Sequence, residues 1–586
     1  MRKPYQICLP ILLVCLIPAL ASAQAPGPQG GGSFRTQCPT ATLLHPGTAG
    51  SGNPAPASSE ASYSGPVYRT AATDPTGAYT YSPALTFLDN GGAIKCQEIS
   101  GGDGMMTEAD GNQTYMFSFG PLSGLQAILN GQPGTQFPSV FNKAYCDPAL
   151  GGNYINQQPN PFPCDANSDP NAALSDPAGI MNTGVLNGNI PAPLMAFDED
   201  DEFLLTLSNV GMIMRPDLFE QHTVHFHGYP NASSFYDGVP DASLAINIGG
   251  SFTYYYVAPD AGTYFWHCHI TPPEHLQMGM VGQLFVRPRQ NRLIANDNLF
   301  NRLAGCAPIP GAPGPAPTCP ARGVNTVVGQ QSDLRTACNP ATDILCSAPI
   351  PAANTGATQP AAGATYVYND GDGSTAYDID VPMQIHGFDP NFHFVGMTFN
   401  PEGFSDMKDK YFLLNGRSYP DTVGVAGGPA DVLGELAAAS NPDPVTHAIS
   451  TNDTDSISRA SQPLHSLITL SASGGHACAA TVTVCGQKAA LRIADLDVQE
   501  YQTLSSIGIP MLVVGFNAKI LRDQAGNNLY IKTNSITLGG GESLDVILDS
   551  TGIAPGTYFL YTPQLDHLSN DAENFGGLMT EVVVIP

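Results

Sequence analysis

The chain has 586 residues, which at about 100–200 residues per domain predicts a protein of several domains. Its formal net charge is −28, from 50 acidic and 22 basic residues, and this balance excludes nucleic acids and anionic membranes as partners. Gly and Pro number 62 and 52. This share of the chain is well above the usual value of about 12%, and the excess predicts many turns and an all-β body.

The first 23 residues have the pattern of a secretory signal peptide. Arg2 and Lys3 precede the apolar run ICLPILLVCLIPAL, and the small residues ASA at 21–23 form a cleavage pattern before Gln24. The apolar run is too short for a bilayer span, and no later stretch is long enough. The sequence therefore predicts a secreted protein, periplasmic or extracellular, without a membrane span.

The cysteines predict disulfides in an oxidising compartment. Two of the 13 lie in the signal segment, which leaves an odd number. Ten of these could form five disulfides, and Cys268 is then the cysteine reserved for another role. Four pairs are close in sequence: Cys146 and Cys164, Cys306 and Cys319, Cys338 and Cys346, and Cys478 and Cys485.

Turn-rich and β-rich segments alternate along the mature chain. Short strands such as SFTYYYVAP, GTYFWHCH and GQLFVRP recur about every ten residues, which is typical of a sandwich or barrel. We expect a loop-rich N-terminal extension, a first β domain with a stapled insertion, a Pro/Ala/Gly-rich linker with cysteines, and a second β domain. Their predicted bounds are 24–109, 110–290, 291–375 and 376–586.

The two β-rich regions are similar near their ends. GTYFWHCH and MVGQLFV in the first region correspond to GTYFLYTP and LMTEVVV in the second, which indicates two copies of one fold. The acidic run DEDDE at 198–202 is interpreted as a solvated turn.

Metal-ligating residues are concentrated in two segments of the first region. In HTVHFHG, His225 and His227 share one face of a strand because side chains alternate with period two. In GTYFWHCHITPPEHLQMGM, His267 and His269 share one face, while Cys268 points to the other. The second strand therefore serves two sites at once.

The face of Cys268 carries the ligand set of a blue copper site. A thiolate, two histidines and a weak axial methionine form the trigonal type 1 arrangement, here Cys268, His222, His275 and Met280. Zinc, inert packing and a disulfide through Cys268 are the alternatives, but structural zinc sites use closely spaced cysteine pairs that this segment lacks. Glu274, beside His275, is either a partner of that ligand or a solvated loop residue.

These motifs resemble those of the multicopper oxidases, the laccase-like cupredoxin proteins. The resemblance extends to NIPAPLMAFDEDDEFLLTLSN, YDGVP, YFLLNGRSYPDT and ITLGGGESLDVILDS. It implies an all-β fold of two cupredoxin-like Greek-key β-sandwich domains with loop-rich insertions, the second lacking most copper ligands. It also implies type 1 copper at the four residues above, and a type 2/type 3 cluster that reduces O2 at four histidines: His225, His227, His267 and His269.

The resemblance leaves three functional readings. The first is a multicopper oxidase-like oxidoreductase that takes electrons from a phenol or a metal ion, although the family's cluster uses more H-x-H pairs than the two found here. The second is a trimeric enzyme like copper nitrite reductase, with His567 as a ligand donated across subunits; the alternative for His567 is a loop histidine. The third is an electron carrier or copper-binding protein with type 1 copper alone. His386 and His393 are the other second-domain histidines without an assigned role.

Overall fold

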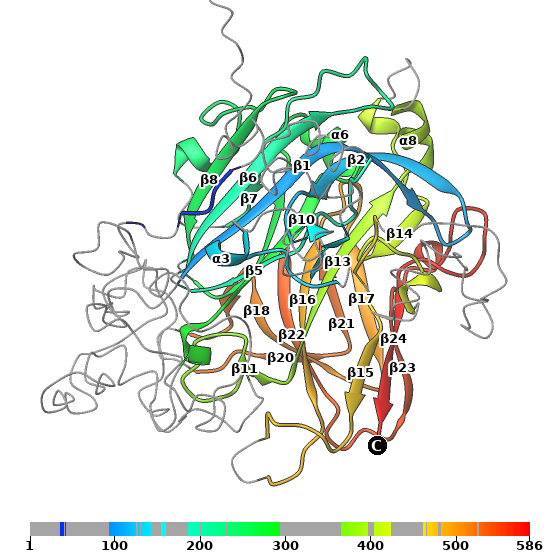
Figure 1. The fold of residues 1–586 in the computed structure, drawn as a ribbon. Helices are drawn as coiled ribbons and strands as arrows, with labels where there is room; N and C mark the ends of the chain where they lie inside the picture. The colour runs from blue at the N-terminus through cyan, green and yellow to red at the C-terminus, as the bar shows by residue number, and fades with distance from the viewer. Residues whose placement is uncertain are drawn as a thin grey trace, which may run out of the picture.

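The computed structural model contains two β-sandwiches, with the β1–β10 strands in one and the β13–β24 strands in the other (Figure 1). The structure describes residues 36–39, 42, 93–124, 127–128, 131–141, 154–155, 158–159, 186–199, 201–228, 233–258, 260–292, 365–396, 403–423, 461–464, 466–478, 482–523 and 527–586. The signal segment and most of the predicted linker lie outside these residues.

The first sandwich consists of two four-stranded sheets, ordered β2-β1-β6-β8 and β5-β10-β9-β7. Its strands are β1 (Ile94–Thr107), β2 (Gln113–Pro121), β5 (Met195–Asp198), β6 (Glu202–Gly211), β7 (His225–Phe226), β8 (Ser251–Val257), β9 (Gly262–His267) and β10 (Val281–Arg287). The helices α3 (Pro138–Phe141) and α6 (Pro272–Gln277) are short, as are the two-residue strands β3 (Tyr154–Ile155) and β4 (Gln158–Pro159).

The second sandwich pairs a sheet ordered β14-β13-β16-β22-β18-β19, with β20 on β18, against a sheet ordered β15-β24-β23-β17-β21. Its first sheet comprises β13 (Ile379–Phe388), β14 (Tyr411–Leu414), β16 (Lys488–Asp495), β18 (Met511–Phe516), β19 (Lys519–Ile520), β20 (Ile531–Thr533) and β22 (Ser543–Asp549). Its second comprises β15 (Ile468–Ser471), β17 (Gln502–Ile507), β21 (Ser535–Leu538), β23 (Gly556–Tyr561) and β24 (Met579–Ile585). The helix α8 (Pro390–Gly396) and the small pair β11 (Thr365–Tyr366) and β12 (Ala376–Tyr377) complete this half.

The two sandwiches repeat one pattern of strand pairing, as the similar sequence segments predicted. Strand β9 pairs antiparallel with β10, and β23 pairs antiparallel with β24. The parallel pairs β1–β6 and β5–β10 likewise correspond to β13–β16 and β15–β24. The all-β, cupredoxin-like fold class is therefore confirmed.

Three buried apolar clusters hold the sandwiches together. One fills the first sandwich around Trp266 and Cys268, and another fills the second around Leu491 and Val546. The third joins the two sandwiches: it contains Phe265 of β9 and residues such as Phe388 of β13. Because hydrophobic burial is the main favourable term in folding, this shared cluster fixes the second sandwich against the strand that carries the metal-ligating motif.

Two local expectations differ from the structure. Residues 94–107, assigned from sequence to a loop-rich extension, form strand β1, which pairs with both β2 and β6. The glycines in the second half of this segment weakened the sequence signal for a strand, because glycine is depleted in strands. The described residues of the acidic run are buried rather than solvated: Asp198 binds Arg287 at 2.7 Å, and Glu199 accepts N–H groups of Ala261 and Asn369. These carboxylates are buried because each has partners.

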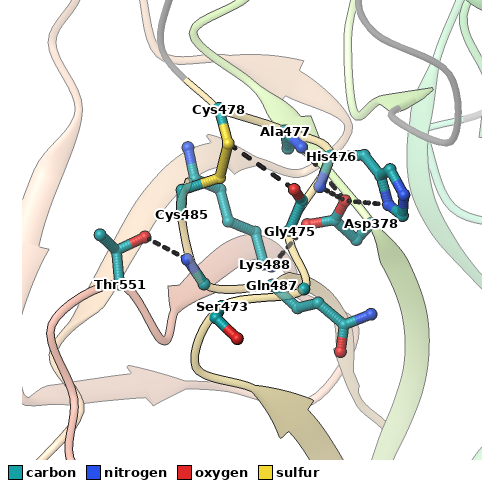
Figure 2. The surroundings of a disulfide bond; sticks show 12 residues. Asp378, Ser473, Gly475, His476, Ala477, Cys478, Cys485, Gln487, Lys488 and Thr551 are labelled. Atoms are coloured by element: carbon teal, nitrogen blue, oxygen red, sulfur yellow. Dashed lines mark hydrogen bonds and ion pairs between the residues drawn. A yellow bond between two sulfur atoms is a disulfide. The ribbon is translucent and has the colours of Figure 1, made fainter. Parts of the chain in front are cut away.

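The disulfide prediction is confirmed where the structure describes the cysteines. Cys478 and Cys485 are bonded beside Asp378, whose carboxylate accepts the backbone N–H groups of His476 and Ala477 (Figure 2). Cys38 is bonded to Cys96, which fastens the N-terminal segment to β1. The other three predicted pairs lie outside the described residues, and so does the signal segment. Among the helices of the described residues, none is both long and apolar enough to span a membrane.

Candidate metal centre

Three side chains from two distant segments converge in the first sandwich. His222 precedes β7, Cys268 follows β9 directly, and His275 lies on α6. Their ligand atoms lie within 4.8 Å of one another, and all three side chains are buried. The Sγ of Cys268 is 3.2 Å from Nδ1 of His275 and 4.0 Å from Nδ1 of His222. The predicted grouping of these three residues is thus observed as a compact triad.

Backbone hydrogen bonds hold each member of the triad in place. His222 is paired with Ile246 through both backbone groups, at 3.1 and 3.0 Å. Cys268 donates its N–H to the carbonyl of Met280, and Met280 donates its own N–H to the carbonyl of His275. Met280 is fully buried in the same apolar cluster as Cys268. The loop from 268 to 280 therefore closes on itself and carries three of the four predicted ligands.

The surroundings of the triad favour a metal-bound thiolate. Cys268 is the free cysteine among the described residues, and its sulfur accepts the backbone N–H of Thr223 at 3.4 Å. His275 faces the carboxylate of Glu220 through Nε2, at 3.3 Å. This second contact fixes the ring so that Nδ1 points to the sulfur, which is the usual arrangement around a ligating histidine.

The pKa shifts in the triad follow from burial and from these contacts. Burial lowers the pKa of His222 well below its usual value. Burial also opposes charge on His275, but the Cys268 sulfur and the hydrogen bonds to Cys268 and Glu220 raise its pKa to about 9. The hydrogen bond from His275 lowers the pKa of Glu220. A bound cation would replace the proton that His275 otherwise holds between two acceptors.

The donor set fits type 1 copper. Two imidazoles, one buried thiol and a methionine in a dry apolar cluster are the ligands of blue copper sites. Zinc favours a different set, because its structural sites usually contain more than one closely spaced cysteine. The residues His222, Cys268, His275 and Met280 therefore form a type 1-like copper site.

A second group of histidines lies on the other side of the β9 strand. The ligand atoms of His225, His227 and His267 lie within 4.8 Å of one another. His225 lies opposite His267 in the antiparallel pairing of β7 with β9. The Nε2 atoms of His227 and His267 are 3.0 Å apart. The alternation that was expected from the H-x-H pattern thus places this triad and Cys268 on opposite sides of one strand.

Burial disfavours the charged form of two histidines in the second group, His227 and His267. The Nδ1 of His225 donates to the carbonyl of Asp237 at 2.7 Å, and the Nδ1 of His267 donates to that of Cys268 at 2.6 Å, while the Nε2 of His267 faces the Nε2 of His227. Burial lowers the pKa of His227 to about 4, helped by His225 and His269. Burial also lowers the pKa of His267 well below its usual value. Neutral imidazoles with a free Nε2 are metal ligands.

His269 lies at the edge of this group rather than within the triad. Its ring centroid is 5.1 Å from that of His225 and 5.5 Å from that of His267. Its backbone N–H is bound by the hydroxyl of Thr223 at 3.0 Å, and its side chain is partly exposed. The four histidines expected from the sequence therefore form a triad with a neighbour.

His567 occupies the second-sandwich position that corresponds to His275. Thr562 donates its N–H to Leu578, and Leu578 donates to His567, which repeats the pattern of Cys268, Met280 and His275. The Nε2 of His567 faces a carboxylate of Glu500 at 2.9 Å, as His275 faces Glu220. Where the first sandwich places a sulfur, however, the Nδ1 of His567 binds the amide oxygen of Gln502 at 2.9 Å.

The contacts of His567 decide its role in this chain. Both ring nitrogens are engaged, the ring stacks on Phe412 at 3.9 Å, and the side chain is buried. A ligand donated to another subunit needs an accessible nitrogen. The structure places His567 buried in the short 3-10 turn η6 (Leu565–His567), so the loop histidine of the sequence analysis is an inward-facing one.

Comparison with known proteins agrees with this geometry. A family model for multicopper oxidases matches residues 174–291, which contain both histidine groups. Multicopper oxidase MCE of Talaromyces pinophilus is 35% identical over 122 residues, 20% of this chain and 19% of that protein. Laccase abr2 of Aspergillus fumigatus is 33% identical over 119 residues, with the same coverage of each chain. The matched segment spans about a fifth of each of these relatives.

Solved structures of copper oxidases align with more of the chain, but at lower sequence identity. A blue copper oxidase from Nitrosomonas europaea aligns with 83% of this chain and 85% of its own, at 16% identity and a TM-score of 0.41. The fold and the cysteine–histidine site define a copper protein of the cupredoxin class. Residues 174–291, which hold both histidine groups, are similar to multicopper oxidases.

Sequence reasoning missed one residue of the site, Glu220. It lies two residues before His222, and nothing in its local pattern distinguishes it from a solvated carboxylate. Glu274, the acidic residue weighed for this role, is partly buried, and burial raises its pKa. The signal that identifies Glu220 is the spacing repeated in the second sandwich, where Glu500 precedes Gln502 by two residues.

Proposed function

We propose that the protein is an exported copper-dependent oxidoreductase that passes electrons from a phenol or a metal ion to O2. The observation that carries the proposal is the junction at Cys268. Its side chain belongs to the type 1-like site, while the adjacent His267 belongs to the second triad. A single peptide bond therefore links a one-electron site to an imidazole-lined site.

Copper held by the type 1-like site would supply one-electron chemistry. The redox potential of such a copper depends on the axial ligand and on the groups around the sulfur. The chain contributes the buried apolar side chains around Cys268 and the N–H of Thr223 that contacts its sulfur. At the second site, we assign the roles of O2-reducing ligands to His225, His227, His267 and His269. Four electrons and four protons convert one O2 to two waters, so a complete reaction needs four single-electron oxidations.

Electron donors are proposed to approach along the surface at Glu220. This carboxylate is partly exposed and contacts the outer nitrogen of His275. The neighbouring Phe219 is 81% exposed, which offers an apolar surface to a phenol ring. The net charge of −28 attracts cations, so metal ions remain a second class of donor. Export is supported by the disulfides, which persist in oxidising compartments.

Copper content and oxygen consumption test the proposal. The protein is loaded with copper, and metal analysis is combined with EPR and visible spectra. A type 1 site alone takes about one copper per chain, a reductase-like pair about two, and an oxidase about four. Oxygen uptake is then measured with phenols and with metal ions, using Cys268→Ser as the control. An electron carrier would be blue without oxygen uptake, and a colourless wild-type protein would refute the proposal.

A further inference from the structure

The second sandwich supplies two buried histidines to the helix that carries His275. His386 lies on β13, far in sequence from the predicted copper ligands. Its Nε2 is nevertheless 2.9 Å from the carbonyl oxygen of Leu276. His393 lies on α8, and its Nε2 is 2.9 Å from the carbonyl oxygen of Gln277. Both carbonyls belong to the last turn of α6.

We propose that His386 and His393 are positioning residues for the type 1 site, because they cap the carboxyl end of α6 and thereby fix His275 and Met280. This inference rests on the proposed copper function of that site. The last carbonyls of a helix have no donor within the helix, and side-chain donors there stabilise the helix end. α6 has only six residues, so these contacts account for much of what holds it.

Gln277 adds a side-chain anchor at the same point. Its amide Nε2 donates to the carboxylate of Asp409 at 2.8 Å, and its Oε1 accepts the backbone N–H of Asp389 at 3.2 Å. Gln277 is fully buried. Three hydrogen bonds from the second sandwich therefore meet the residue two positions after His275.

The two histidines are themselves held firmly. The Nδ1 of His393 is 2.5 Å from the carbonyl oxygen of Tyr115, and its ring centroid is 4.2 Å from that of Phe388. Phe388 and Leu276 pack in the apolar cluster shared by both sandwiches. Each ring has a carbonyl oxygen facing both of its nitrogens, and it caps α6 when Nε2 carries a proton.

Backbone hydrogen bonds connect α6 to the predicted ligands. His275 lies on the helix, and its carbonyl accepts the N–H of Met280 at 2.8 Å. Met280 in turn accepts the N–H of Cys268. A displacement of the end of α6 therefore moves two predicted ligands relative to the thiolate, and it changes the copper geometry without touching a ligand side chain.

The test compares variants that remove or retain the donor. His386→Leu and His393→Leu remove it, whereas His386→Gln and His393→Gln retain an N–H near the Nε2 position. His567→Leu is the matched control, since this buried second-sandwich histidine binds Gln502 and Glu500 instead of α6. Copper affinity is measured by chelator competition, and the type 1 EPR and visible spectra are recorded for each full-length, copper-loaded protein.

We expect both Leu variants to bind type 1 copper about 10–100-fold more weakly, as is typical when a partner behind a metal ligand is lost. Their EPR spectra should change, and the Gln variants should recover most of both effects. His567→Leu should lower the unfolding midpoint but leave the spectrum unchanged. Folding is checked by the fluorescence of the buried Trp266, the single tryptophan of the chain. If a Leu variant does not fold, the Phe variant at that position keeps a ring without a donor and carries the same expectation.

Wild-type spectra and affinity in folded donor-free variants would overturn the inference, and so would an equal change in the His567→Leu control. A wild-type protein without any type 1 signal would instead refute the proposed function. The two failures are therefore distinguishable in one set of measurements.

Discussion

Gly101 is the residue whose substitution should most specifically disturb the type 1-like site without altering a ligand. It lies in β1, where the register with β6 shifts between Gly101 and Gly102. A Cβ at Gly101 would lie 2.5 Å from Cδ2 of the His222 ring, whereas ordinary contacts begin at 3.4 Å. Gly101→Ala therefore requires a shift of about 1 Å, a scale at which core overpacking is felt.

The imidazole, rather than either backbone, must make this shift. His222 is fixed by two backbone hydrogen bonds to Ile246, and Gly101 is paired with Phe119 in the β1–β2 ladder. A ring moved by about 1 Å no longer meets the geometry that a preorganised site requires. We expect copper affinity to fall about 10–100-fold, which corresponds to about 1.4–2.7 kcal/mol.

The assay is chelator competition with EPR on the Gly101→Ala protein. Gly104→Ala is the control on the same strand: its Cβ would lie 3.0 Å from the carbonyl oxygen of Gly188 and does not meet His222. The control should lose a similar amount of fold stability, about 1–3 kcal/mol, but keep the wild-type spectrum. A Gly101→Ala protein with unchanged affinity and spectrum would show that the packing of β1 does not set the position of His222.

Three further outcomes are expected. Glu220→Gln should keep the blue colour but lower kcat/KM about 10-fold, because the charge behind His275 is lost; unchanged kinetics would contradict this. Arg492→Leu should lower the free energy of unfolding by about 3–5 kcal/mol in urea titrations, since it removes the buried cation 3.2 Å from Asp545 and leaves that carboxylate with the neutral partners Thr263 and Tyr368. Burial raises the pKa of Asp495, so the folded state holds a proton there and its stability declines as pH rises above the unfolded pKa. Asp495→Asn should therefore flatten this decline and add about 1 kcal/mol at pH 8, and an unchanged pH profile would refute the assignment.

The ligand residues were predictable because the motif combines local spacing with strand alternation. Cys268, His275 and Met280 lie within 13 residues of one another, and His267 and Cys268 must face opposite sides of an extended chain. The position of Gly101 against His222 was not predictable, because the two residues come from segments that are far apart in the sequence. Tertiary contacts between distant strands leave no periodic signal in either segment.

The all-β class was likewise predictable from turns and short strands, but β1 was not. Its segment IKCQEISGGDGMMT has glycines in its second half, and strand propensity falls at such positions. The structure uses those glycines for close approach: Gly101 meets His222, and Gly104 meets Gly188. The residues that weakened the sequence signal are therefore the ones that allow β1 to pack against the site.

The second sandwich has the same backbone arrangement as the type 1-like site, but with other residues at three of the four ligand positions. Gln502, Thr562 and Leu578 stand where the first sandwich has His222, Cys268 and Met280, while His567 remains. A direct hydrogen bond from Gln502 to His567 connects residues whose counterparts would meet through a metal. An amide–imidazole bond needs no ion and no redox change, so this frame is stable on its own. The second sandwich therefore needs no metal to hold His567, and its contacts with the first sandwich include those of His386 and His393 with α6.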